Sequence, residues 1–302
     1  MKQQQKTMYL LMTLLMFAWG LEYIFAKQAL AVMESLTLVF IKYSIGFVVV
    51  LLIKLKTEGR KLFCKKDIPL FLLCAIFGEI GYFYLEYSAM DYLPVSLITI
   101  VLAFVPALSI IIERVIYKRK PTKKMNLGIL FCIAGIILVI GVDYRILFQG
   151  RILGYLLAFG AVFSWNLYNF LTASLHERYS SATLTLNQLI CTILLVWPYA
   201  LSHLPDPGAV SMGVVGGILY LGTLSTGIGF IIQVRSLHIL GPTVTAIFSN
   251  FLPVTTTLFG WLILKETILP VQVLGGAIVI AAGYIVIKEK GRAEELTDDR
   301  ES

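Results

Sequence analysis

The apolar stretches in the first third of the chain carry four ionisable side chains, Glu22, Lys42, Glu79 and Glu86. If these stretches cross a membrane, each charge costs about 2.5–3.5 kcal/mol near the centre of a lipid-facing helix. Together that is on the order of 10 kcal/mol, comparable with a whole domain's stability. The four groups must therefore face a protein interior, pair or bind protons. Such residues mark substrate and ion pathways in membrane proteins.

Helix geometry places Glu22 and Lys42 at one depth. With a rise of 1.5 Å per residue, Glu22 lies roughly 20 Å from the inner end of its stretch, and Lys42 roughly 9 Å from the outer end of the next. One interpretation is a polar site in which Lys42 attracts a substrate carboxylate. The other is a structural Glu22–Lys42 pair, and the sequence leaves both open. Glu79, with no obvious partner, and Glu22 are the candidate proton-coupling groups, whereas Glu86 is expected to be solvated near the outer surface.

The second half of the chain carries amides in place of charges. Asn166 and Asn169 lie three residues apart, beside Trp165 and Tyr168. They favour a hydrogen-bonding wall opposite the charged groups, although buried amides also join helices at about 0.6–2 kcal/mol each. Aromatic rings here either stack on a substrate or pack between helices. The candidate substrate-binding residues are Trp19, Glu22, Lys42, Glu79, Tyr82, Trp165, Asn166, Tyr168, Asn169 and Asn250.

The composition is that of an integral membrane protein. Of 302 residues, 58% are hydrophobic and 14% charged, against about 45–50% and about 25% in soluble domains. Four cysteines and three histidines show no metal or disulfide spacing. The sequence has neither a nucleotide-binding loop nor a catalytic constellation. These features predict a protein that is not an enzyme and holds no metal or cofactor.

Ten apolar segments approach the roughly 20 residues that cross a bilayer as a helix. We therefore predict an all-α membrane protein with ten transmembrane helices, the first being retained rather than cleaved as a signal peptide. The segments lie near 8–28, 36–55, 68–89, 94–115, 125–142, 152–174, 183–203, 211–234, 243–264 and 270–288.

Positive charges orient these helices. Twenty of the 25 Lys and Arg residues fall in the segments that are cytoplasmic when the N-terminus is inside. The positive-inside rule therefore predicts a multi-pass protein of the cell inner or plasma membrane with both termini cytoplasmic.

The second half of the chain repeats the first. Because five helices is an odd number, the two copies are predicted to be inverted, as in many transporters. The predicted units are repeat 1 at 8–142, a linker at 143–151, repeat 2 at 152–288 and a cytoplasmic tail at 289–302, which is expected to be charged and disordered from Gly291 to Ser302. Pro94, Pro106, Gly128 and Gly135 recur 147 or 148 residues later as Pro242, Pro253, Gly276 and Gly283, and Trp19 recurs as Trp165.

The repeated prolines and glycines suggest separate roles. Pro106 and Pro253 fall inside predicted helices, where proline removes a backbone hydrogen bond, so the pair is a candidate hinge or a fixed kink. Pro94 and Pro242 are expected to begin helices. The glycines of the last helix in each half allow close packing within the chain or at a homodimer face.

The whole pattern resembles the EamA family of the drug/metabolite transporter superfamily. The resemblance rests on Phe17-Ala18-Trp19-Gly20, on the paired prolines, on Leu264-Lys265-Glu266 and on the glycines of the last helices. It implies a ten-span secondary transporter, often an exporter of amino acids or other small metabolites. Two features depart from the pattern, namely Glu22 and the basic run Lys118-Arg119-Lys120 where the second half has Lys265-Glu266.

The sequence leaves three alternative functions open. The first is a secondary transporter that exports a small organic metabolite such as an amino acid by alternating access, with protons as the coupling ion. The second is a multidrug-type exporter of lipophilic cations, with Glu22 and Glu79 as counter-charges. A distant third is an intramembrane enzyme or a lipid-handling protein.

Overall fold

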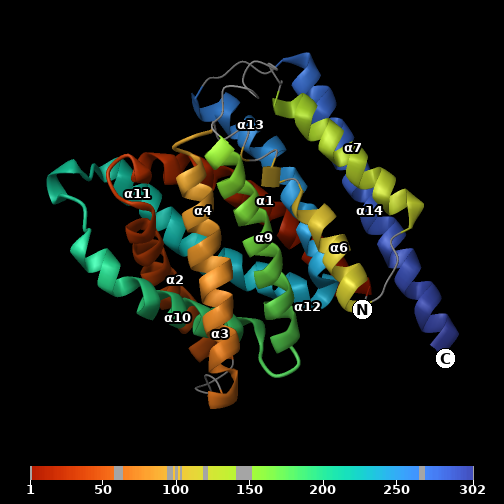
Figure 1. Cartoon of the computed structure of the whole chain (residues 1–302), viewed down its shortest axis with the longest axis horizontal. Coiled ribbons are helices and arrows are strands. Elements are labelled where there is room, and N and C mark those ends of the chain that lie inside the picture. The colour runs from red at the N-terminus through yellow and green to blue at the C-terminus, as the bar shows by residue number, and fades with distance from the viewer. Residues whose placement is uncertain are drawn as a thin grey trace.

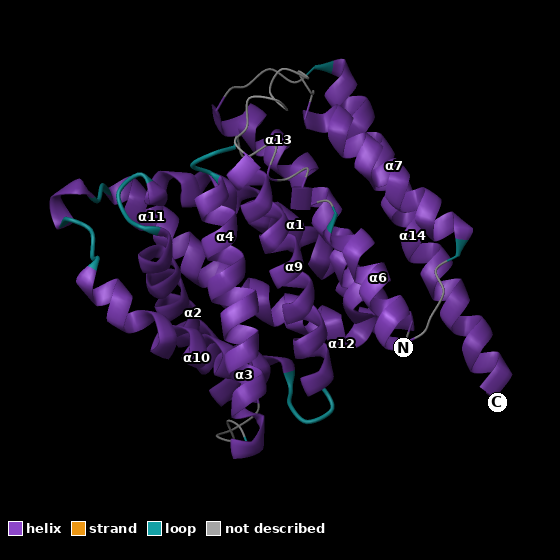
Figure 2. Cartoon of the chain, viewed as in Figure 1, coloured by secondary structure: helices purple, strands orange, loops and turns teal. Residues whose placement is uncertain are grey.

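A computed structural model describes residues 2–57, 64–93, 98, 101–102, 104–117, 122–140, 152–264 and 269–301. Within these ranges every regular element is a helix, and there are no strands (Figure 2). Several sequence predictions fall outside the described residues, namely the helix start at Pro94, the basic run at 118–120, the linker at 143–151 and Lys265-Glu266.

The first half of the chain forms long helices joined by short turns (Figure 1). Its third apolar segment is one continuous helix whose winding changes along its length. The elements are α1 (Lys2–Leu30), α2 (Ser35–Thr57), η1 (Lys65–Asp67), α3 (Ile68–Cys74), η2 (Ala75–Gly81), α4 (Tyr82–Ala89), α6 (Val105–Tyr117) and α7 (Lys123–Ile140).

The second half has the same plan. Hydroxyl side chains cap two of its helices, because Ser180 Oγ accepts from Thr183 N and Ser211 Oγ from Val214 N, both at 3.3 Å. The elements are α9 (Ile152–Leu175), α10 (Ser181–Ser202), η3 (Pro207–Ala209), α11 (Met212–Tyr220), η4 (Leu221–Ile228), α12 (Gly229–Phe248), η5 (Ser249–Phe251), α13 (Leu252–Leu264) and α14 (Pro270–Glu301).

Six helices among the described residues are long and apolar enough to cross a membrane. One of them, Met212–Ile263, has 52 residues and would be roughly 80 Å long if straight. It is broken at Gly241, whose φ of 77° and ψ of 165° are not helical, and Pro242 begins the next helix as predicted. The chain is thus a multi-pass, all-helical membrane protein, and ten crossings stay a prediction.

The two halves pack through contacts that each join a helix of one half to a helix of the other. α2 packs on α10, and α7 lies beside α14 along one edge of the molecule (Figure 1). In the same way α1 packs on α12 and η4 while α9 packs on α4 and η2. Gly128 and Gly135 serve the α7–α14 contact, since an added Cβ would lie 2.4 Å from Val286 and 2.9 Å from Gly275 O. These two glycines therefore act within the chain, and the homodimer stays untested.

A π-helical segment interrupts the same helix in both repeats. η2 covers Ala75–Gly81 and η4 covers Leu221–Ile228, about 147 residues apart. π-Helical turns are rare and occur mostly at functional sites. Their recurrence at matched positions indicates that this distortion belongs to the plan of the repeat.

Pro253 perturbs its helix locally. The three residues before Leu252 form the 3₁₀ turn η5, and the Ser249 carbonyl accepts from Leu252 N–H instead of a helical partner. α6 begins at Val105, immediately before Pro106, and Asn166 Nδ2 donates to the Val105 carbonyl at 3.2 Å. At Pro253 the carbonyl that loses its helical donor is thus satisfied by Leu252 N–H, and the hinge interpretation of both prolines stays a prediction.

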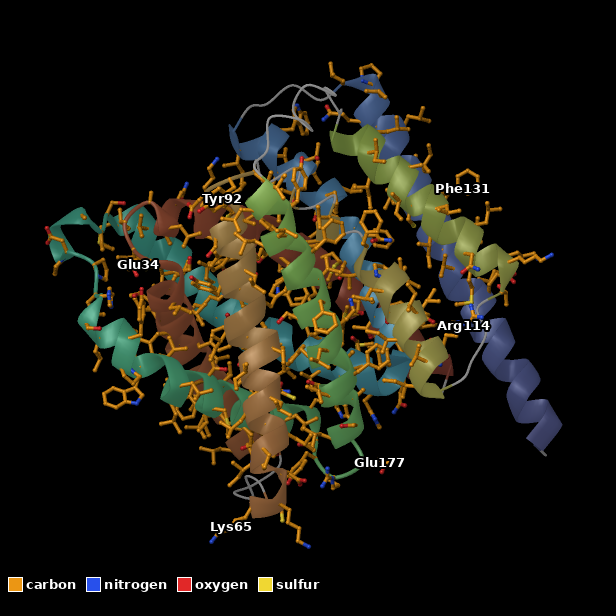
Figure 3. The ribbon with its side chains drawn as sticks, viewed as in Figure 1. Glu34, Lys65, Tyr92, Arg114, Phe131 and Glu177 are labelled. Carbon is orange, nitrogen blue, oxygen red and sulfur yellow. The ribbon has the colours of Figure 1, made fainter. Side chains whose placement is uncertain are left out.

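Two opposite faces of the helix bundle can be named after residues that are labelled in Figure 3. Both chain ends lie on the side that carries Lys65 and Glu177, while Glu34 and Tyr92 lie on the opposite side (Figures 1 and 3). We call these the Glu177 face and the Glu34 face. The C-terminal segment differs from the disordered tail that was expected, because α14 continues as helix to Glu301.

Candidate functional site

Glu22 and Lys42 form the expected ion pair between α1 and α2. Lys42 Nζ lies 2.9 Å from Glu22 Oε1 and donates to Tyr87 Oη at 2.9 Å. The ammonium also lies 3.3 Å from the centroid of the Phe83 ring, which adds a cation–π contact. Lys42 is 0% exposed, so its charge is fully engaged by partners within the protein.

The second carboxylate oxygen of Glu22 reaches the other repeat. Ser225 Oγ in η4 donates to Glu22 Oε2, and the Ser225 carbonyl accepts from Trp19 Nε1 at 3.3 Å. The π-helical segment thus presents both its hydroxyl and a backbone carbonyl to α1. Glu22 therefore links three helices, α1, α2 and the η4 segment, at one point.

Glu86 is buried, which corrects the expectation that it would be solvated. It is 2% exposed, and its Oε1 accepts from Tyr23 Oη and Tyr82 Oη, both at 2.7 Å. Tyr82 and Glu86 share one face of α4 because they are four residues apart. Two phenol donors replace water around this carboxyl, which sequence position alone did not reveal.

Glu79 lies apart from this network. It belongs to η2 and is 0% exposed. Thr192 Oγ1 of α10 donates to its Oε2, whereas its Oε1 has no hydrogen-bond partner among the described residues. A buried carboxyl with one neutral donor is costly as an anion. This arrangement suits a group that gains and loses a proton.

The amides of the second half join helices. Gln188 Oε1 accepts from Tyr168 Oη at 3.3 Å, and Gln233 Nε2 donates to Asn169 Oδ1 at 3.1 Å. Asn250, another candidate, is buried in η5 and does not line the cavity described below. Of the ten candidates, Trp19, Glu22, Tyr82 and Trp165 line that cavity, whereas the other six do not, namely Lys42, Glu79, Asn166, Tyr168, Asn169 and Asn250.

Aromatic rings fill the centre of the bundle. The rings of Trp19 and Trp165 are 5.9 Å apart, and those of Tyr82 and Trp165 are 4.7 Å apart. Phe83 and Phe230 complete the cluster at 6.4 Å. Such edge and tilted contacts are worth about 0.5–1.5 kcal/mol beyond burial, and they bring the two repeats into direct contact.

A cavity lies against this cluster. It is only about 40 Å³ in this conformation, far below the 300 Å³ or more typical of ligand sites. Helices must therefore separate to admit a metabolite. Lys42 and Glu79 are not among its walls, which are Trp19, Glu22, Tyr23, Ala26, Tyr82, Phe83, Glu86, Tyr87, Leu102, Val105, Trp165, Ser249 and Leu252.

Sequence reasoning missed several partners of the site. Ser225 and Thr192 are hydroxyls in apolar segments, a pattern too common to single them out. Tyr23 follows Glu22 directly, and its proximity to Glu86 depends on how α1 and α4 pack. The repeat offset was the one usable signal, since it places Phe230 opposite Phe83.

Comparison with known proteins places this geometry in a family. Residues 6–141 and 152–288 each match the EamA-like transporter family. The chain belongs to this family. A similar fold occurs in a crystal structure with a TM-score of 0.77 at 16% identity, covering 94% of this chain and 98% of the other.

Several EamA relatives resemble the chain along most of its length. An uncharacterized transporter of Archaeoglobus fulgidus is 21% identical, covering 93% of this chain and 99% of the relative. The uncharacterized transporter YyaM of Bacillus subtilis is 25% identical over 84% of this chain and 86% of its own length. The family and these relatives indicate a transporter rather than an enzyme.

Proposed function

We propose that this EamA transporter carries a small organic molecule across the membrane by alternating access of the cavity between its repeats. The observation that carries the proposal is the composition of the cavity wall. Trp19 of the first repeat and Trp165 of the second face the same space, so a movement between the repeats changes its opening. Substrate sites at the repeat interface are the rule for inverted-repeat transporters.

The chemistry of the wall favours a substrate with a positive charge. Glu22 and Glu86 line the cavity among aromatic rings, a combination that holds organic ammonium groups. The Lys42 ammonium donates to Glu22 and Tyr87 and does not line the cavity. An organic cation therefore fits these walls better than an anion.

An amino acid is the second candidate. Its ammonium group would use the same carboxylates. Its carboxylate, however, would require Lys42 to leave Glu22, from which it lies 2.9 Å. We therefore place amines and organic cations ahead of zwitterions in the substrate range.

We infer that protons drive the cycle. Glu79 is buried with a single hydroxyl donor, and Glu22 and Glu86 accept hydrogen bonds from hydroxyl groups. A carboxyl that releases its proton on one side and receives one on the other couples substrate to the proton gradient. An inward gradient would then drive substrate out, the export direction that the EamA resemblance implies.

The test uses purified protein in liposomes with an imposed pH gradient. The probes are tetraphenylphosphonium as a lipophilic cation and leucine as a zwitterion, each added separately. We expect gradient-driven transport of the cation, reduced at least about tenfold by Glu86→Gln, because a lost charge pair at a dry site costs a few kcal/mol. Asp206→Asn, the same carboxyl-to-amide change at an exposed residue outside the cavity and both hollows, is the matched control. Equal transport of the cation by wild type and Glu86→Gln would contradict the cation assignment.

A further inference from the structure

The two repeats can be aligned residue by residue through features present in both. Trp19 corresponds to Trp165 at an offset of 146 residues, and Phe83 corresponds to Phe230 at an offset of 147. Each of these pairs is in ring contact, at 5.9 Å and 6.4 Å. Side chains that meet their own counterparts lie on the axis that relates two inverted repeats. The offsets therefore assign a counterpart to each polar residue of the site.

The ion pair of the first repeat has a neutral copy in the second. The offset of 146 converts Glu22 into Tyr168 and Lys42 into Gln188. The copy keeps the contact, since Tyr168 Oη donates to Gln188 Oε1 at 3.3 Å where Lys42 lies 2.9 Å from Glu22. The interaction between the first two helices of a repeat is thus conserved in position while both charges are gone.

The second acidic contact is copied in the same way. Tyr23 corresponds to Asn169 at offset 146, and Glu86 corresponds to Gln233 at offset 147. Tyr23 Oη donates to Glu86 at 2.7 Å, and Gln233 Nε2 donates to Asn169 Oδ1 at 3.1 Å. Again the pairing is retained and the carboxylate is replaced by an amide.

Glu79 completes the series. Its counterpart is Thr226, and the counterpart of its donor Thr192 is Gly46. The pair is again in contact, because a Cβ added to Gly46 would lie 2.8 Å from Thr226 Cγ2. Each of the three buried carboxyls, Glu22, Glu79 and Glu86, therefore has a neutral residue at the equivalent place.

The cavity is asymmetric about this axis. Both members of the counterpart pairs Trp19–Trp165, Leu102–Ser249 and Val105–Leu252 line it, but the rest of its wall comes from the first repeat alone. Its residues on the first repeat include Glu22, Tyr23, Ala26, Glu86 and Tyr87. The counterparts of these five residues line no part of it and are packed shut, each 2% exposed or less. They are Tyr168, Asn169, Thr172, Gln233 and Val234.

Each face of the molecule has a hollow, and only the hollow at the Glu34 face shares a residue with the cavity. Tyr87 lines both the cavity and a hollow that also contains Glu34 and Tyr92, so the cavity leads toward the Glu34 face (Figure 3). The opposite hollow contains His176, whose ring nitrogen lies 2.6 Å from the Val234 carbonyl. That path ends at Val234, the counterpart of Tyr87.

We propose that the closed counterpart residues form a second, neutral half-site, which opens toward the Glu177 face when the acidic half-site closes. This half-site would present Tyr168, Asn169, Thr172 and Gln233 to the substrate. An organic cation would then meet carboxylates when the cavity faces the Glu34 side and only hydroxyls and amides when it faces the Glu177 side. The alternate opening and the assignment of a cation both rest on the proposed function, whereas the pairing of each acidic residue with a neutral counterpart does not.

Gly78 holds the neutral half-site shut. It is the counterpart of Ser225, which donates to Glu22, and it lets the Tyr168 ring pack directly on η2. A Cβ at Gly78 would lie 2.0 Å from Tyr168 Cδ2, a distance that packed atoms do not adopt. Any side chain at Gly78 would push Tyr168 away from η2. It would therefore favour the conformation in which the neutral half-site is open toward the Glu177 face.

Cysteine labelling tests the half-site without knowledge of the substrate. Ala26→Cys and Thr172→Cys are introduced separately into a full-length protein whose four native cysteines are replaced by serine. A membrane-impermeant maleimide is added to either side of the membrane. We expect Ala26→Cys to react from the Glu34 face and Thr172→Cys from the Glu177 face. Reaction of both from one face, or no reaction of Thr172→Cys while probe transport continues, would overturn the proposal.

Gly78→Ala independently tests the equilibrium between the conformation open to the Glu34 face and the conformation open to the Glu177 face. It should raise the labelling rate of Thr172→Cys and lower that of Ala26→Cys. Gly216→Ala is the matched control, because nothing lies within 4 Å of a Cβ added there. If both rates fall together relative to that control, the two openings are not exclusive, and the proposal fails. If Gly78→Ala does not fold, the labelling of the two single variants still decides.

Gln233→Glu tests the chemistry of the half-site. A carboxylate at the position equivalent to Glu86 should lower the half-saturation concentration of tetraphenylphosphonium at the Glu177 face by about tenfold and leave the value at the Glu34 face unchanged. An equal change at both faces, or none, would contradict a neutral half-site on that side. If labelling follows the expected pattern but the cation is never transported, the substrate assignment fails while the half-site stands.

Discussion

At the scale of single residues, the site is a set of buried charges with assigned partners. Lys42 is neutralised by Glu22, held by Tyr87 and covered by Phe83. A buried pair of this kind contributes little net stability, yet removing one partner leaves the other charge uncompensated. We therefore interpret the Glu22–Lys42 pair as structural in this conformation, while Glu22 still contributes to the cavity wall.

Lys42→Met should destabilise the protein by about 3–5 kcal/mol, because Glu22 would be left buried without its counter-charge. The double variant Lys42→Met/Glu22→Gln should recover most of that loss. Thermal unfolding of the detergent-solubilised protein measures both effects. A double variant less stable than the single one would show that the pair is not the main interaction of these side chains.

The sequence indicated the buried charged residues better than their contacts. Glu22, Lys42, Glu79 and Glu86 were identifiable from the cost of burying them, and the Glu22–Lys42 contact followed from depth. The solvation expected for Glu86 was wrong because Tyr23 comes from a helix distant in sequence. The Ser225 contact was not predictable either, since it requires the packing of η4 on α1.

At the scale of elements, the fold is held together by close packing between helices. α7 and α14 pack along their lengths (Figure 1), and glycines at their interface allow the backbones to approach. The sequence predicted these glycines and the long apolar helices well. The π-helical segments η2 and η4 could not be predicted, because their winding depends on which carbonyls the neighbouring helices satisfy.

Gly135→Leu should separate α7 from α14. An added Cβ would already lie 2.9 Å from Gly275 O, and overpacking of this kind costs about 1–3 kcal/mol. Ala134→Leu, at an exposed position of the same helix, is the control. Equal melting temperatures for the two variants would contradict the assigned packing.

The contact that closes the Glu177 face should depend on pH. Burial lowers the pKa of His176 from 6.5 to about 4, so the neutral ring favours the closed arrangement. Closure should therefore be most stable above about pH 6.5 and should weaken as the pH falls toward about 4, because burial and the neighbouring His238 disfavour the charged ring. The ring stacks on His238 at 4.9 Å, and the same hollow holds Glu177, Arg178 and Arg235.

Labelling of Thr172→Cys from the Glu177 face should accordingly accelerate as the pH is lowered through this window. The rates must be corrected for the intrinsic pH dependence of the thiol, using as reference a separate variant that keeps only the exposed Cys64. His176→Gln should remove the acceleration. A pH profile identical in both backgrounds would exclude His176 as the group responsible.

At the scale of the whole molecule, two repeats share a backbone plan and differ in chemistry. The sequence predicted the repeat and its division of charge and amide. The structure adds that the differences occur at equivalent contacts, with Glu22–Lys42 matched by Tyr168–Gln188. The symmetry of the backbone permits two openings, and the asymmetry of the side chains makes those openings chemically distinct.

The most direct test of this account is a pair of distances across the two faces, measured by electron spin resonance on spin-labelled protein in liposomes. One pair joins Ala31 to Asp91 at the Glu34 face, and its counterpart joins Glu177 to His238 at the Glu177 face. We predict that adding tetraphenylphosphonium or changing the pH shifts the two distances in opposite directions. Two distances that change together, or that both stay fixed while the probe is transported, would contradict alternating access between these repeats.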